Sequence, residues 1–170
     1  TTKTIINMGM SIKLYPINSD ISRDNFDAIA KEIETNNERE VDLYKITPDL
    51  YMLLSNTPEP FGDSDSIESF ALLGRKSLTS DEDFEIKYGF QLNSYLNEVD
   101  VKEVYQWIQE KKLDSESGFY SHFEALDDDV KEMIDSFGSP IEELCSYFQD
   151  LTALYKFASQ NNHYVVVVIQ

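Results

Sequence analysis

The stretch YVVVVI, at positions 164–169, limits the possible folds of this chain more than any other feature. It is far shorter than the roughly 18 apolar residues that a membrane helix needs. Because valine and isoleucine are branched at Cβ, the stretch favours a strand over a helix. Since it is continuously apolar and does not alternate with polar residues, we expect a strand that is buried on both faces and central in a sheet.

The segment before this strand predicts a long core helix that ends at Asn161. Ser139 is suited to cap it, Pro140 to occupy its first turn and Glu142 to complete a capping box. One face of this helix is apolar over about five turns. The residues on that face are Ile141, Leu144, Cys145, Phe148, Leu151, Leu154, Tyr155 and Ala158.

Shorter periodic segments predict the remaining elements. Residues 10–17 and 83–90 alternate as strands do, and residues 41–46 fit either a strand or the start of a helix. Helices are expected over 22–34, 48–55, 67–73, 100–112 and 127–137, and an irregular loop over 56–66. We expect Ser22 to cap the first of these helices. In the helix over 100–112, we expect Asp100 to be the cap and Glu103 to complete the capping box.

These elements predict a single α+β domain over residues 8–170. A small mixed sheet that includes both chain ends would be covered by roughly four to six helices. The long C-terminal core helix would be followed by the buried terminal strand. Because Met8-Gly9-Met10 offers a natural start, we interpret residues 1–7 as a tag remnant or an alternative start.

The net charge of the chain limits the classes of partner that it is expected to bind. The sequence has 32 acidic and 14 basic residues, a formal net charge of −18. Such a surface repels phosphate backbones and anionic lipid, so we expect neither nucleic acid nor membrane as a partner. A basic protein would instead be attracted over long range. The alternative explanation is that the excess of acids only keeps the protein soluble.

The sequence carries no recognisable catalytic signature. Its only side chains with imidazole or thiol chemistry are His122, His163 and Cys145, without the short spacings of a zinc site. It has no glycine-rich phosphate loop and no nucleophile elbow. His163 precedes the terminal strand, where an imidazole commonly bonds a backbone carbonyl, and Cys145 lies on the apolar helix face. We therefore expect no enzyme activity, no metal and no cofactor.

The N-terminal residues and the number of cysteines predict the cellular location of the protein. Residues 1–17 show no signal-peptide pattern, and a single cysteine cannot form an internal disulfide. We therefore expect a cytoplasmic protein.

Acidic residues concentrate in one part of the sequence. Between Asp114 and Glu143 there are ten acids and one lysine, Lys131. An acidic outer face over an apolar inner stripe explains this pattern structurally. The functional interpretation is a surface that meets a cationic groove, with aromatic side chains as anchors. The residues predicted to bind a partner are Asp114, Glu116, Phe119, Tyr120, Glu124, Asp127, Asp128, Asp129, Glu132 and Asp135.

Several short motifs resemble the YfbM-like family, a bacterial domain family of unknown function. They are Met8-Gly9-Met10, Leu73-Gly74, Ser77-Leu78 and Asn162-His163 followed by the valine run. The resemblance covers nearly the whole chain from Met8. It implies no catalytic activity, and it implies a kinship with domains encoded beside bacterial toxin genes as immunity proteins. The expected function is thus a non-enzymatic immunity protein that binds and occludes a basic toxin or effector.

The sequence departs from the family pattern at one segment. Members often carry Trp-Asp and then Leu-His where this chain has Thr47-Pro48 and Tyr51. If the family segment forms a ligand pocket, this chain lacks its polar groups there, which favours protein binding. Two alternatives stay open: a small-molecule-binding domain or minor enzyme with a pocket near Tyr51 and His163, and a structural subunit whose acidity serves solubility.

Overall fold

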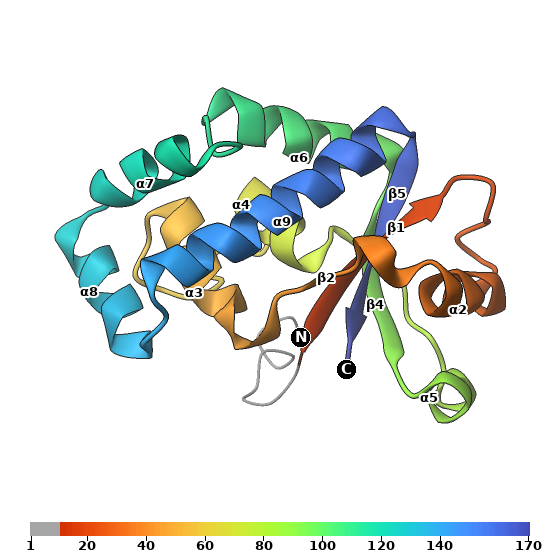
Figure 1. Ribbon diagram of the computed structural model, residues 1–170. Helices are drawn as coiled ribbons and strands as arrows, with labels where there is room; N and C mark the ends of the chain where they lie inside the picture. Colours follow the sequence, from red (N-terminus) through yellow and green to blue (C-terminus); the bar gives the residue numbers. More distant parts are fainter. Residues whose placement is uncertain (1–10) are drawn as a thin grey trace.

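The computed structural model describes residues 11–170, which fold into a five-stranded antiparallel sheet and eight α-helices (Figure 1). The strands lie in the order β2-β1-β5-β4-β3. They are β1 (Ile12–Asn18), β2 (Val41–Asp42), β3 (Lys76–Ser77), β4 (Gln91–Leu96) and β5 (His163–Ile169). The predicted α+β class, with the first and last described strands in one sheet, is confirmed. Within the described residues the sheet is antiparallel and not mixed, and eight helices take the place of the predicted four to six. Our interpretations of residues 1–7 and of Met8-Gly9-Met10 lie outside the described residues.

Strand β5 is the central strand and is buried on both faces, as its composition predicts. Val165 and Val167 belong to the apolar cluster on one face, and Tyr164, Val166 and Val168 belong to the cluster on the other. β5 pairs with β1 along one edge and with β4 along the other. Both edges are therefore hydrogen-bonded, and the end of the described chain forms the middle of the core.

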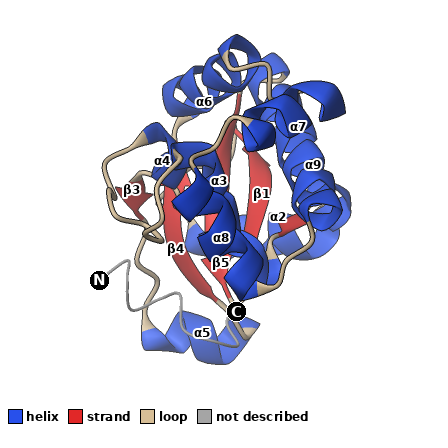
Figure 2. Cartoon of the chain, turned by 90° about the vertical axis from the view of Figure 1, so that its left-hand side faces the viewer, coloured by secondary structure: helices blue, strands red, loops and turns tan. Residues whose placement is uncertain are grey.

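Helices cover both faces of the sheet (Figures 1 and 2). One face carries α2 (Phe26–Thr35) and α5 (Glu82–Tyr88). The other carries α3 (Thr47–Ser55), α4 (Ile67–Leu73), α6 (Glu98–Glu110), α7 (Glu116–Glu124), α8 (Asp128–Phe137) and α9 (Ile141–Gln160). The sheet is thus the middle layer between two sets of helices.

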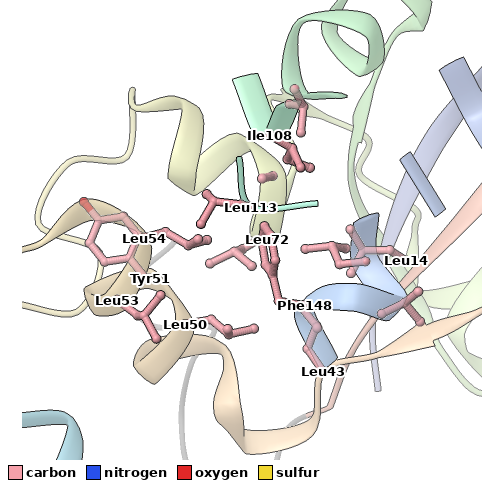
Figure 3. Close-up of a cluster of buried hydrophobic side chains, with 14 of the residues drawn as sticks. Leu14, Leu43, Leu50, Tyr51, Leu53, Leu54, Leu72, Ile108, Leu113 and Phe148 are labelled. Atoms are coloured by element: carbon pink, nitrogen blue, oxygen red, sulfur yellow. The ribbon is translucent and has the colours of Figure 1, made fainter. Parts of the chain in front are cut away.

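Helix α9 is the predicted long core helix, and its apolar face packs into the larger cluster. Figure 3 shows Phe148 of this helix in one cluster with Leu14 of β1 and Leu72 of α4. The helix differs from the prediction at its start, where Pro140 and not Ser139 is the N-cap residue. The loop over residues 56–66 is confirmed.

Two other helices begin at residues that we did not predict. Helix α2 is capped by Asn25 and not by Ser22, so it starts later than expected. Helix α6 is capped by Asn97, and its capping box is completed by Asp100, the residue that we expected to be the cap. Glu103 therefore has no part in the box. Both helices lie where the apolar periodicity places them, since periodicity defines a helix better than its ends.

The predicted strand over residues 83–90 is wrong, because most of these residues form helix α5. The Asp81 side chain accepts a hydrogen bond from the Phe84 N–H at 2.8 Å, and Gly89 ends the helix at a φ of 80°. The strand of this region, β4, comes directly afterwards.

Helix α7 was also not predicted. Residues 41–46 contain both alternatives, β2 and then a 3-10 helix over Tyr44–Ile46.

A buried carboxylate joins the start of α6 to the turn after α4. Asp100 is 4 % exposed, and its oxygens accept hydrogen bonds from Arg75 at 2.8 Å and Lys76 at 3.0 Å. It also accepts the Asn97 N–H at 3.1 Å. Burial alone would raise the pKa of the Asp100 carboxyl, but these hydrogen bonds outweigh burial and lower its pKa below the usual range. The folded state therefore holds Asp100 ionised.

We expect Asp100→Asn to lower the free energy of unfolding at neutral pH by about 2 kcal/mol, because it leaves two cations without their buried partner. The folded pKa is lowered, so this stabilisation is present above the unfolded pKa and is lost as the pH falls toward the folded value. Urea unfolding over a series of pH values measures both effects. Glu103→Gln is the control, because Glu103 also contacts Arg75 but its side chain is 57 % exposed. Equal losses in the two variants would contradict the assignment.

Candidate functional site

The acidic window predicted from the sequence lies on α7, on α8 and in the turns beside them. All eight of its carboxylates are exposed, and we call them the acidic surface: Asp114, Glu116, Glu124, Asp127, Asp128, Asp129, Glu132 and Asp135. Figure 1 shows α7 and α8 at the end of the molecule away from α2 and α5. The structure thus brings these predicted acids to one end of the fold.

The negative charge of the acidic surface is not neutralised by ion pairs within the described residues. Within residues 11–170, no ion pair includes any of its eight acids. Lys131 lies among them, but its Nζ donates a hydrogen bond to the Glu124 backbone carbonyl at 2.8 Å. The same Nζ lies 5.9 Å from the centre of the Phe123 ring. A cationic partner would therefore meet carboxylates without having to displace a protein cation from them.

Two hydrogen bonds hold α7 and α8 against α3. The ring N–H of His122 Nε2 donates to the Leu53 carbonyl at 2.8 Å, which joins α7 to α3. The Asp127 N–H donates to the Asn56 side-chain oxygen at 3.0 Å, which joins the start of α8 to the end of α3. The acidic surface is therefore carried by helices in fixed positions and not by a loose segment.

One predicted partner-binding residue is placed in the core. Phe119 is 0 % exposed, and its ring packs 5.6 Å from that of Phe148 on α9. It cannot reach a partner, because the periodicity of α7 turns it inward. Tyr120 is half-buried beside it, and burial, followed by nearby negative charge, raises the pKa of the Tyr120 hydroxyl. Tyr120 keeps part of its surface accessible.

Helix α8, which carries part of the acidic surface, has two exposed apolar side chains. Met133 is 37 % exposed and Phe137 is 50 % exposed, and they lie one helical turn apart. Met133 is apolar, but it lies outside the buried stripe of α8. The spacing of Val130 and Ile134, which are buried, could have shown that Met133 lies outside that stripe.

The structure does not join Tyr51 and His163 in one pocket. Tyr51 is 2 % exposed, stacks on Phe61 at 4.8 Å and accepts the Asp63 N–H at 3.1 Å through its hydroxyl. His163 donates from Nδ1 to the Asn161 carbonyl at 3.1 Å, the structural role that we expected. No hydrogen bond or aromatic contact links the two side chains in the described part of the chain.

Other chemistry is sparse in the described residues. No group of three or more His, Cys, Asp and Glu side chains within residues 11–170 is arranged to hold a metal ion. Cys145 is 3 % exposed, and burial, followed by the charge of Glu116, raises the pKa of its thiol. It is the packing residue that its helix position predicts. None of the helices in this range has the length and apolar character needed to cross a membrane.

Comparisons with known proteins place the chain in a family. Its fold is similar to the crystal structure of YfbM, a protein of unknown function from Escherichia coli, with a TM-score of 0.55 and 15 % sequence identity. The likeness covers 95 % of this chain and 99 % of that one, and at this identity it shows a shared fold alone. No curated protein sequence matches the chain. A family model does match residues 8–168, and the chain therefore belongs to the family described as "Domain of unknown function (DUF1877)".

Proposed function

We infer that this domain is a non-catalytic immunity protein, which binds and neutralises a cognate toxin or effector in the bacterial cytoplasm. The observation that supports this function best is the acidic surface, eight exposed carboxylates without ion-pair partners among the described residues. Met133 and Phe137 add exposed apolar area on α8, which carries part of this surface. Exposed apolar side chains among polar and charged ones are typical of a specific protein interface.

The charge of the surface suggests how neutralisation works. A toxin that acts on nucleic acid needs a cationic groove for phosphate, and fixed carboxylates can occupy that groove in place of phosphate. Long-range attraction speeds the encounter, and burial of Met133 and Phe137 would then slow dissociation. The toxin would be blocked because its groove is filled, without any reaction on the immunity protein.

The experiment that tests this function is capture of partners from the native cells. The tagged protein is washed at low and at high salt, and the bound proteins are identified by mass spectrometry. We expect one stoichiometric partner with a basic toxic domain, whose toxicity in a host cell is suppressed when this protein is co-expressed. If no partner is retained at either salt concentration, or if co-expression gives no protection, the proposed function is rejected.

We expect the triple variant Asp127→Lys, Asp128→Lys, Asp129→Lys to slow association with that partner about tenfold or more at low ionic strength. The association rate should also depend less on salt, because fewer charges attract the partner. Stopped-flow or surface binding kinetics at several salt concentrations measure both quantities.

The matched control is charge reversal of Glu82, Asp83 and Glu85, three exposed acids in the first turn of α5. Both triple variants change the net charge equally, and both place lysines at the start of a helix, where positive charge is unfavourable. Only the α8 variant should affect the rate strongly. Similar rates in both variants would mean that the total charge, and not the acidic surface, guides association.

A further inference from the structure

A polar cleft of about 530 Å³ lies on the face of the sheet that α2 and α5 cover. Its walls come from the β1–α2 loop, from β3 and β4 and from the first residue of α6, and Tyr164 of β5 contributes to its lining. In Figure 1 this loop lies on the other side of the sheet from α7 and α8. The volume fits a small metabolite, and no residue of the acidic surface lines the cleft.

Arg23 is the fixed cation of this cleft. Its guanidinium carbon lies 5.3 Å from the centre of the Tyr95 ring and 5.7 Å from that of Tyr164, so two aromatic rings hold it. Tyr164 is itself fixed, because its hydroxyl donates to the Ile21 carbonyl at 2.9 Å. Nη1 of Arg23 donates to Glu98 Oε1 at 3.2 Å. The charge is thus positioned in advance, and the Arg23 side chain is still 41 % exposed.

Arg23 lines the cleft, and its guanidinium has more donors than hydrogen-bond partners among the described residues. Among the described residues, Nη1 is the Arg23 atom with a hydrogen-bonded partner, although a guanidinium offers five N–H groups. A carboxylate is the group that matches two adjacent guanidinium donors. The cleft can therefore accept a ligand carboxylate without breaking the contact between Arg23 and Glu98.

The other charged residues of the cleft indicate which groups a ligand carries besides a carboxylate. Glu98 and the exposed Asp24 line the same cleft, so its net charge is negative in spite of Arg23. A dicarboxylate or a phosphate would be repelled by the net negative charge, and a simple cation would leave the guanidinium donors of Arg23 without an acceptor. A molecule with one carboxylate and one ammonium group satisfies both signs at once. Ser22 and Ser77 also line the cleft, and their hydroxyl groups can form neutral hydrogen bonds with a ligand.

From this arrangement we propose that the cleft is a binding site for a zwitterionic small molecule of the α-amino acid class. Arg23 binds the carboxylate, Glu98 and Asp24 bind the ammonium group, and the remaining volume holds the ligand side chain. The site is separate from the acidic surface, so it stands or fails independently of the proposed immunity function. It gives the domain a small-molecule site in addition to its protein-binding surface.

The test uses the whole protein and the protein amino acids as probes, first in mixtures and then singly, at millimolar concentration. We expect at least one to raise the melting temperature by mass action and to give a one-to-one calorimetric titration. Its N-acetyl derivative and its carboxamide, which each lack one of the two charges, should bind about tenfold more weakly or worse. If no amino acid shifts the melting temperature, or if both derivatives bind as well as the parent, the proposal is overturned.

Variants locate the site. Arg23→Gln should abolish the shift, and Glu98→Gln should weaken binding about tenfold. The matched control is Arg39→Gln, because Arg39 is also an arginine over an aromatic ring, 3.7 Å from the centre of Phe157, but lies outside the cleft. It should bind as the unchanged protein does. Unchanged binding in Arg23→Gln would overturn the proposal, and if that variant does not fold, Glu98→Gln and the two derivatives decide the question.

Discussion

Gly118→Ala should lower the free energy of unfolding by about 3 kcal/mol or more. A Cβ atom at this position would overlap with the carbonyl oxygen of Lys112, which belongs to the backbone and cannot rotate away. Lys112 adopts a φ of 57°, so the turn between α6 and α7 passes very close to the first turn of α7. The N–H of Gly118 is meanwhile fixed to Ser115 Oγ at 3.1 Å. Relief of the overlap therefore requires α7 to move.

The control for this variant is Gly138→Ala at the end of α8. Gly138 has a φ of 83°, but an added Cβ would meet nothing within 4 Å. Alanine there should cost only the left-handed backbone penalty, about 1–2 kcal/mol. Chemical unfolding of the two variants compares the costs. Because α7 carries part of the acidic surface, Gly118→Ala should also weaken partner binding, whereas equal costs at the two glycines would show that the close approach is unimportant.

The elements predicted best from the sequence are those whose apolar residues alone indicate how they are buried. β5 is apolar at every position and α9 repeats one apolar face, so only one type of element suits each. Helix α5 shows the opposite case. Phe84, Ile86 and Tyr88 alternate like a strand, but Phe84 and Tyr88 are also one helical turn apart, and their rings lie 4.7 Å from each other. Ile86 is 76 % exposed, so the alternation was accidental and the cap at Asp81 decided the structure.

The candidate sites, too, could be predicted from the sequence only in part. The acids of the acidic surface are close together in the sequence, and their exposure follows from the high cost of burying a carboxylate. Which aromatic side chain turns inward depends on a tertiary contact, and Phe119 is buried because Phe148 of α9 packs on it. The polar cleft could not be found from the sequence at all. Arg23, Tyr95 and Tyr164 meet there from three separate segments.

Deletion of residues 165–170 should abolish cooperative folding. Each of the apolar side chains removed is at most 8 % exposed, and their burial contributes roughly 1.5–3 kcal/mol apiece. That sum is similar to the whole stability of a typical domain, about 5–15 kcal/mol. The deletion also leaves the facing edges of β1 and β4 without their hydrogen-bonded partner. We expect no unfolding transition by circular dichroism, and aggregation through the exposed edges.

A graded version of this test keeps the chain length constant. Val167→Thr preserves the side-chain shape but buries a hydroxyl group at a site that is 0 % exposed, and it should cost about 1–3 kcal/mol. Val99→Thr makes the same change on α6, where the side chain is 63 % exposed, and should leave stability nearly unchanged. Urea unfolding gives both values. A truncated chain that still unfolds cooperatively, or equal effects at the two valines, would mean that β5 is not the strand on which both faces of the core depend.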